Sequence, residues 1–260
     1  MSAHFLVNER LGAAMTVLEF GKEKPRVLIL LHGGGLSWWN YRKAAEKLSE
    51  LFHVVLPVLD GHAGSDASFT SIEDNAARII RYIDEHFGGE VTAIAGLSLG
   101  GQVALEILSQ KADICHFALI ESALVKPSRL THALIAPSFS LSYGLIKQKW
   151  FATLQASYLG IPQDLFEDYF RDTCRITKED MIAFLKANSI YRINPTLSQT
   201  SAKVHLVAGS REQKSILDSA RYLQSAIPGS TLEFLPGYRH GDLSINHPAQ
   251  YAQILQNLIK

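Results

Sequence analysis

Cysteine is scarce in this chain, and its scarcity excludes two ways of stabilising a protein. The 260 residues contain only two cysteines, Cys115 and Cys174. Two are too few for a disulfide framework, and their separation does not match the spacing of metal-binding cysteines. We therefore expect two free thiols, with no metal and no other cofactor.

An excess of charge of one sign is also missing. Lys plus Arg and Asp plus Glu both number 25, so the formal net charge is zero. Proteins that bind nucleic acid or anionic membranes by electrostatics usually carry a basic excess. The composition therefore predicts neither nucleic acid nor a membrane as a partner.

Long apolar runs are absent as well. No run reaches the roughly 18 residues of a membrane span, and residues 1–10 lack the basic and apolar regions of a signal peptide. We therefore expect a cytoplasmic protein. Hydrophobic residues make up 47% of the chain, which is enough for a sizeable core, and the length fits one α/β domain with an insertion.

Strand-like and helix-like segments alternate along most of the chain. Continuous apolar runs such as 26–31 and 52–59 are typical of strands buried on both faces. Residues 4–7 and 14–20 are expected to form a hairpin. Such alternation indicates the α/β class, with a mostly parallel central sheet flanked by helices. The other expected strands are 91–95, 117–120, 204–208 and 231–235, and the expected helices are 41–51, 71–87, 102–110, 214–226 and 248–259.

The alternation stops after Glu121 and resumes only at 204–208. The stretch between them is helical in pattern and rich in aromatic residues, and a structureless loop of that length is improbable. The sequence therefore predicts a helical cap over 122–195, inserted after the sixth strand. The remaining 1–121 and 196–260 would form the core.

One segment between an expected strand and an expected helix has the spacing of a nucleophile. Gly96-Leu97-Ser98-Leu99-Gly100 fits the pattern Gly-x-Ser-x-Gly. A strand that turns at once into a helix strains the residue at the apex, and its neighbours two positions away must be small. Ser98 would then be exposed beside a helix N-terminus, which favours an oxyanion. A glycine-rich turn that serves packing alone is the alternative.

Acyl transfer by a serine also needs a histidine base. His240 lies just past the last expected strand, where a loop can return its side chain to the top of the sheet. His247 is the nearest rival, but it precedes Pro248 at a helix start and is expected to cap that helix. His240 is therefore the predicted base.

The base in turn needs a carboxylate that orients it. Glu212 follows the strand at 204–208 and is the favoured acid. Glu121, at the end of the strand at 117–120, is the runner-up, so the choice between the two stays open. The predicted catalytic residues are Ser98, Glu212 and His240.

Backbone donors for the oxyanion are expected from His32-Gly33-Gly34-Gly35, a flexible segment that follows a core strand. The predicted pair is the N–H groups of Gly34 and Leu99, the latter being the residue after the nucleophile. Gly35 and Trp38 are predicted to contact the substrate. We interpret His32 and His62, in loops expected near the site, as structural residues.

Together these segments resemble the α/β-hydrolase superfamily, specifically the single-domain serine hydrolases with a helical cap. The resemblance includes Gly-His-Ala-Gly-Ser-Asp at 61–66, where the family commonly shows Asp-x-x-Gly-His-Gly-x-Ser. Here Val58 stands in the place of the Asp, and Ala63 replaces the second glycine. Glu212 also stands where Asp is usual.

The resemblance implies a carboxylic ester hydrolase that works through an acyl-enzyme, as a monomer or a homodimer, on a small-molecule ester. Fold does not select chemistry, so two alternatives stay open. One is C–C bond or thioester hydrolysis, or a lyase step, by the same residues. The other is a receptor-like protein that binds a ligand and turns it over slowly.

Overall fold

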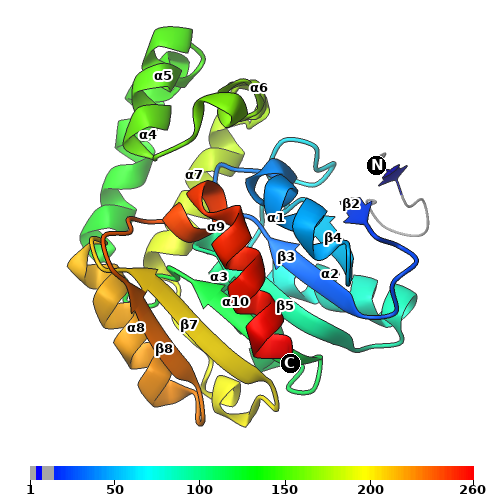
Figure 1. Ribbon diagram of the computed structural model, residues 1–260. Helices are drawn as coiled ribbons and strands as arrows, with labels where there is room; N and C mark the ends of the chain where they lie inside the picture. Colours follow the sequence, from blue (N-terminus) through cyan, green and yellow to red (C-terminus); the bar gives the residue numbers. More distant parts are fainter. Residues whose placement is uncertain (1–3, 8–14) are drawn as a thin grey trace.

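One twisted sheet runs through the molecule, with helices on both of its faces (Figure 1). The computed structural model describes residues 4–7 and 15–260. The eight strands lie in the order β1-β2-β4-β3-β5-β6-β7-β8. Neighbours from β4 to β8 in this order pair in parallel, and the antiparallel β1 and β2 form one edge. The strands are β1 (His4–Val7), β2 (Thr16–Phe20), β3 (Val27–Leu31), β4 (His53–Pro57), β5 (Val91–Leu97), β6 (Cys115–Glu121), β7 (Lys203–Gly209) and β8 (Thr231–Leu235).

This sheet confirms the predicted α/β class and its mostly parallel order. The expected hairpin strands pair, with His4 opposite Glu19, while the connection between them lies outside the described residues. The helices are η1 (Trp38–Tyr41), α1 (Arg42–Leu48), α2 (Ile72–Phe87), α3 (Leu99–Gln110), α4 (Arg129–Ile146), α5 (Lys149–Tyr158), η2 (Gln163–Leu165), α6 (Phe166–Arg175), α7 (Lys178–Ile190), η3 (Pro195–Gln199), α8 (Lys214–Ala226), α9 (Asp242–Asn246) and α10 (Pro248–Ile259).

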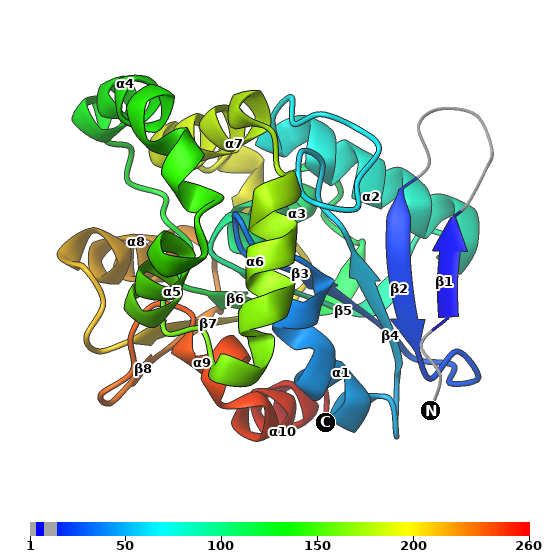
Figure 2. The same ribbon diagram turned by 90° about the horizontal axis from the view of Figure 1, so that it is seen from above.

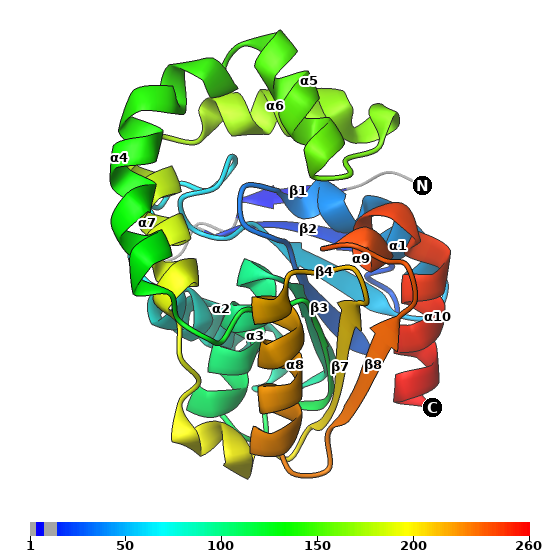
Figure 3. The same cartoon turned by 90° about the vertical axis from the view of Figure 1, so that its left-hand side faces the viewer.

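The sheet separates two apolar layers because side chains alternate along each strand. Ile29 and Leu31 of β3 point to the layer that packs against α2 and α3. Leu28 and Leu30 point to the opposite layer, against α1 and α10. Figure 3 shows α2 and α3 on one side of the strands and α1 and α10 on the other. Burial on both faces explains the continuous apolar runs of these strands.

Four helices, α4 to α7, occupy the stretch between β6 and β7 and lie over one end of the sheet (Figure 1). This is the predicted insertion after the sixth strand, and we call these helices the cap. The exact domain boundaries at 122 and 195 stay a prediction. Trp39 Nε1 donates to Asp172 of α6 at 2.9 Å, and the Phe69 N–H donates to Asp180 of α7 at 2.8 Å. These bonds fix the cap to η1 and to the loop before α2.

Both cysteines are free, as predicted; Cys115 is buried and Cys174 is partly exposed. Within the described part of the chain, no helix has the length and hydropathy needed to cross a bilayer.

Candidate active site

The turn at Ser98 is strained in the way its sequence predicts. Ser98 has φ 53° and ψ −111° and separates β5 from α3. A Cβ on Gly96 would lie 2.2 Å from the Gly100 carbonyl oxygen, and a Cβ on Gly100 would lie 2.1 Å from the Leu31 oxygen. Both positions therefore exclude any side chain. The Ser98 N–H donates to the Glu121 carbonyl at 2.8 Å, which ties the turn to the end of β6.

Two backbone donors beside Ser98 are unoccupied. The Gly33 N–H donates to Asn40 Oδ1 at 3.3 Å, and the Gly35 N–H donates to His62 Nε2 at 3.0 Å. Among the described residues, the N–H groups of Gly34 and Leu99 have no acceptor. The two residues are adjacent, since a Cβ on Gly34 would lie 3.4 Å from Leu99 Cδ2. Both N–H groups of the predicted pair are thus unpaired, and their binding of an oxyanion stays a prediction.

Glu212 and His240 form a hydrogen-bonded pair. Nδ1 of His240 lies 2.7 Å from Glu212 Oε2. The Glu212 side chain is fully buried, and its Oε1 accepts from Ser122 Oγ at 2.5 Å and from the Gly209 N–H at 2.9 Å. The imidazole is 46% exposed. A buried carboxylate held by three donors can fix the tautomer and orientation of this histidine.

The pKa of His240 reflects two opposed effects. Desolvation lowers it, but the hydrogen bond and charge of Glu212, with the charges of Glu121 and Asp242, outweigh this and raise the pKa above its ordinary value. The carboxylates therefore favour a protonated imidazole. A histidine that gains a proton readily is suited to act as a base.

Glu121 is a second carboxyl group nearby, and it does not contact His240. Its Oε1 accepts from the Ser244 N–H at 3.3 Å, and its buried Oε2 has no hydrogen-bond partner in the described structure. Burial raises the pKa of Glu121 to about 7, although the hydrogen bonds of Ser244 oppose this. The geometry thus pairs the favoured acid, Glu212, and not the runner-up, with His240.

Ser98 and His240 lie in neighbouring segments without a direct bond between their side chains. A Cβ on Gly241 would lie 3.3 Å from Leu97 Cδ2, so the loop of His240 packs against the residue before the nucleophile. No hydrogen bond joins Ser98 Oγ to His240 across the described residues. Such bonds are often long without substrate and shorten in the complex.

His32 and His62 hold the loops around the oxyanion donors, as the structural interpretation predicts. His62 Nδ1 lies 3.0 Å from the Asp60 carbonyl and its Nε2 accepts from Gly35, while His32 Nε2 accepts from the Leu59 N–H at 3.1 Å. Burial lowers the pKa of His32 to about 3 and that of His62 to about 4. Both rings are therefore neutral near pH 7, and each uses its nitrogens to fix backbone.

Other sequence predictions have mixed outcomes. His247 is the residue before α10, but its side chain makes no capping bond; its ring stacks on Tyr238 at 4.4 Å instead. Trp38 is half-buried on η1, with the Arg42 guanidinium 5.7 Å from the centre of its ring. Substrate contact by Trp38 and Gly35 stays a prediction.

Sequence reasoning missed Ser122, whose hydroxyl holds Glu212. Ser122 is buried and has φ 58°, a conformation that few non-glycine residues adopt. It comes directly after β6, so its position at a strand end was the available signal.

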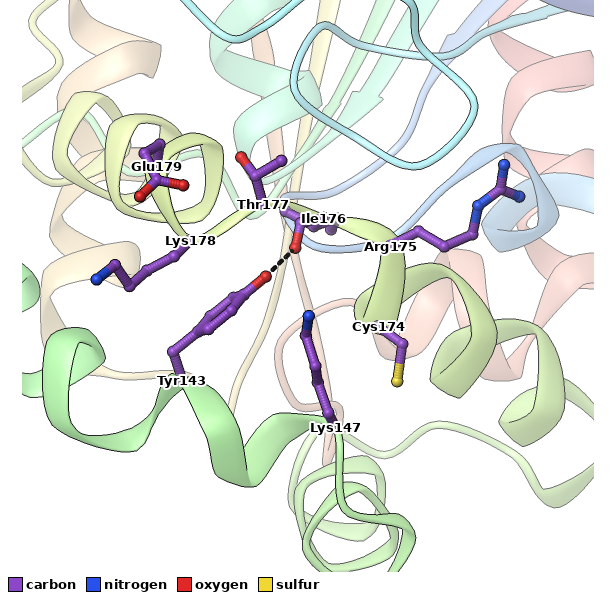
Figure 4. Close-up of a pocket in the computed structure, with 8 residues that line it drawn as sticks. All are labelled: Tyr143, Lys147, Cys174, Arg175, Ile176, Thr177, Lys178 and Glu179. Carbon is purple, nitrogen blue, oxygen red and sulfur yellow. Dashed lines mark hydrogen bonds between the residues drawn. The ribbon is translucent and has the colours of Figure 1, made fainter.

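A pocket of about 380 Å³ lies within the cap, between the end of α4 and the junction of α6 and α7 (Figure 4). The Tyr143 hydroxyl crosses it to donate to the Ile176 carbonyl at 2.6 Å. None of the predicted site residues lines it. No group of three or more His, Cys, Asp or Glu residues suited to a metal ion occurs in residues 4–7 and 15–260. The lining residues are Tyr143, Lys147, Cys174, Arg175, Ile176, Thr177, Lys178 and Glu179.

Comparison with known proteins identifies the family of this chain. Residues 28–254 match the model of the alpha/beta hydrolase family. A soluble epoxide hydrolase from Corynebacterium sp. (strain C12) is 31% identical over 104 residues, which cover 40% of this chain and 36% of that protein. The chain thus aligns with only about a third of this curated relative.

Solved structures match over nearly the whole chain. A thermophilic esterase from Thermogutta terrifontis has a TM-score of 0.75 and 16% identity, over 99% of this chain and 97% of that one. The enol-lactonase from Burkholderia xenovorans LB400 has a TM-score of 0.79 and 16% identity, over 98% and 99%. At such identities the likeness shows a shared fold.

Proposed function

The chain belongs to the alpha/beta hydrolase family, and on that premise we propose that it is a serine hydrolase. Its substrates would be small to medium carboxylic esters, cleaved through an acyl-enzyme. One observation carries the proposal: the buried Glu212 carboxylate holds His240 at 2.7 Å in a loop that packs against the strained turn of Ser98. Two structural neighbours, an esterase and an enol-lactonase, agree with ester chemistry.

The proposed reaction begins at Ser98 Oγ. Nε2 of His240 accepts the hydroxyl proton while Oγ attacks the ester carbonyl carbon. The negative charge that develops on the carbonyl oxygen is stabilised by the free N–H groups of Gly34 and Leu99 and by the N-terminus of α3. His240 then donates its proton to the leaving alcohol.

Hydrolysis of the acyl-enzyme would repeat these steps with water. His240 accepts a proton from the water as it attacks the acyl carbon, and returns that proton to Ser98 Oγ when the acid leaves. Glu212 stays ionised and stabilises the imidazolium in both halves. The cycle needs no group beyond these residues and water.

Turnover of p-nitrophenyl acetate and butyrate tests the proposal. The Ser98→Ala variant lacks the nucleophile, and we expect its kcat to fall by about 10³-fold or more. Ser225→Ala is the matched control, because that hydroxyl donates to the Tyr222 carbonyl on α8, and we expect full activity. Undiminished turnover by Ser98→Ala would overturn the proposal.

Labelling with a fluorophosphonate separates an enzyme from a binding protein. We expect Ser98 to react, and Ser98→Ala to stay unlabelled. A serine that stays inert in the unaltered chain would favour the receptor-like alternative. A series of acyl chains of increasing length would then measure the preferred ester.

A further inference from the structure

Helix α4 is apolar on two opposite sides, and only one of them is covered. On the inner side, Ile135 and Ile146 are buried and Phe139 and Tyr143 pack against the core. On the outer side, four leucines are four, seven and four residues apart, so they share one face of the helix. They are Leu130, Leu134, Leu141 and Leu145, exposed by 72%, 53%, 90% and 41%.

Helix α5 repeats this pattern. Ala152 and Ala156 are buried on one side. Trp150, Leu154 and Tyr158, each four residues from the next, are exposed by 64%, 64% and 80% on the other. Most of the large exposed apolar side chains in the described residues therefore belong to these two helices. Exposed apolar patches of this kind usually mark a contact surface.

The two exposed stripes belong to helices on the same side of the cap. Tyr143 of α4 donates to the Ile176 carbonyl, between α6 and α7, and Gln155 of α5 accepts from Tyr169 of α6 at 2.7 Å. Figure 1 and Figure 2 both show α4 and α5 at the outer edge of the cap, on one side of α6 and α7. Each stripe lies opposite the packed side of its helix. We call Leu130, Leu134, Leu141, Leu145, Trp150, Leu154 and Tyr158 together the outer cap face.

The segment that carries this face has charged residues of one sign only. Residues 122–163 contain four Lys or Arg residues and no Asp or Glu. Arg129 and Lys147 stand at the two ends of α4, about five helical turns apart and so on the same flank of the stripe. Neither has an ion pair with any described residue, although the Lys147 ammonium lies 4.9 Å from the centre of the Tyr143 ring, beside the cap pocket. Lys126 and Lys149, in contrast, pair with Asp218 and Glu167. The zero net charge of the whole chain hides this local excess.

These charges disfavour a second copy of the chain as the occupant. Antiparallel pairing along α4 would place Arg129 of one copy near Lys147 of the other, and parallel pairing would place identical cations together. No acidic side chain of the segment could compensate them, and burying unpaired charges is costly. An anionic lipid surface offers the opposite complement. Its phosphates attract cations, its headgroup region favours Trp and Tyr, and its acyl boundary accepts leucines.

We propose that the outer cap face is a docking surface for an anionic lipid bilayer. The helices would lie in the plane of the headgroups, with the leucine stripe of α4 immersed and Arg129 and Lys147 at the phosphates. This orientation turns the cap, and not the core, toward the membrane. The proposal is independent of the reaction proposed for Ser98.

Co-sedimentation of the full chain with vesicles tests it. We expect binding to vesicles of phosphatidylcholine mixed with phosphatidylglycerol, weakened by salt. Leu141→Glu/Leu154→Glu should reduce this binding by more than about tenfold. Arg129→Gln/Lys147→Gln should reduce it by about fivefold for each cation without changing binding to pure phosphatidylcholine. The control is Leu51→Glu/Tyr222→Glu, two apolar residues outside the face that are exposed by 50% and 46%, and it should bind fully.

Three outcomes would overturn the proposal. The first is no binding of the unaltered chain to phosphatidylglycerol vesicles at low salt. The second is an equal loss in the Leu51→Glu/Tyr222→Glu control. The third is a homodimer in sedimentation equilibrium that Leu141→Glu/Leu154→Glu dissociates, which would make the face a subunit interface. Circular dichroism and thermal unfolding would check that each variant is folded. None of these measurements depends on hydrolytic activity.

Discussion

At the scale of single residues, the two carboxyl groups near His240 differ in what they contact. Glu212 bonds to the ring, and Glu121 acts on it only through charge. We expect Glu212→Gln to lower kcat by about 10³- to 10⁴-fold, because an amide no longer stabilises the imidazolium. Glu121→Gln should keep kcat within a few-fold. An equal loss in both variants would contradict this assignment of the acid.

The pH profile gives a second, independent reading of Glu121. A base works only when it is neutral, and the raised pKa of His240 places the acidic limb of kcat/KM above pH 6.5, the ordinary value for histidine. The charge of Glu121 contributes to that rise. Glu121→Gln should therefore move the limb to lower pH, measured with a soluble p-nitrophenyl ester. A limb that stays in place would show that Glu121 is uncharged near pH 7.

His62 illustrates a residue that acts through another one. Its Nε2 accepts a hydrogen bond from the Gly35 N–H at 3.0 Å. This bond fixes the backbone of the loop next to the unpaired Gly34 N–H. His62→Phe keeps an aromatic ring to stack on Phe184 but removes the acceptor. We expect kcat to fall by about tenfold with little change in KM. Since a merely structural loss would lower the unfolding temperature instead, both quantities should be measured.

At the scale of elements, the turn between β5 and α3 makes strict demands on its glycines. A Cβ on Gly100 would lie 2.1 Å from the Leu31 oxygen, whereas one on Gly144, in α4, would meet nothing within 4 Å. Gly100→Ala should therefore lower the free energy of unfolding by about 3 kcal/mol or more. Gly144→Ala should raise it by about 0.5–1 kcal/mol, because alanine is the better helix former. Urea denaturation compares the two, and a Gly100→Ala protein as stable as the unaltered chain would contradict the steric reading.

The elements that the sequence predicts best are those with a long periodic pattern. Helices α8 and α10 begin and end where they were expected, because their apolar spacing and Pro248 define them locally. Helix α3 is predicted to begin at 102 but begins at Leu99, since the turn at Ser98 leaves no room for a loop. Helix α9 has five residues and was not predicted, because so short a helix has no period.

The candidate site is predictable from the sequence only where a local pattern marks it. Strand ends and spacing locate Ser98, Glu212 and His240. The choice of partner for His240 depends on contacts between distant segments. A Cβ on Gly209 would lie 2.2 Å from the Tyr238 oxygen, so the loops of Glu212 and His240 touch backbone to backbone. Ser122 completes the pair from a third segment, and no local pattern reveals it.

At the scale of the whole molecule, two buried neutral histidines make the fold sensitive to acid. The pKa of His32 is about 3 and that of His62 about 4 in the folded chain, against 6.5 when unfolded. The unfolded chain thus binds more protons below pH 6.5, so stability is full above that pH and is lost as pH falls toward the folded values. Charging His62 alone costs about 3 kcal/mol.

Urea denaturation across pH checks this. We expect the free energy of unfolding to decline steadily between pH 6.5 and 4, and the decline to be shallower in His62→Phe. His116→Gln is the control, because that ring is 62% exposed, and its slope should match the unaltered chain. A stability that stays flat over this range would mean that neither buried ring resists protonation.

Helix α7 of the cap contacts the loops that hold the predicted oxyanion donors. Asp180 accepts the Phe69 N–H, and Phe184 stacks on His62 at 4.5 Å, while His62 holds Gly35. Helix α7 of the cap is therefore connected to the predicted oxyanion donors through a continuous series of contacts. Under the proposed function, we expect an acyl group bulky enough to displace α7 to lower kcat as well as to raise KM. Selectivity among esters would then be set partly at the chemical step and not by binding alone.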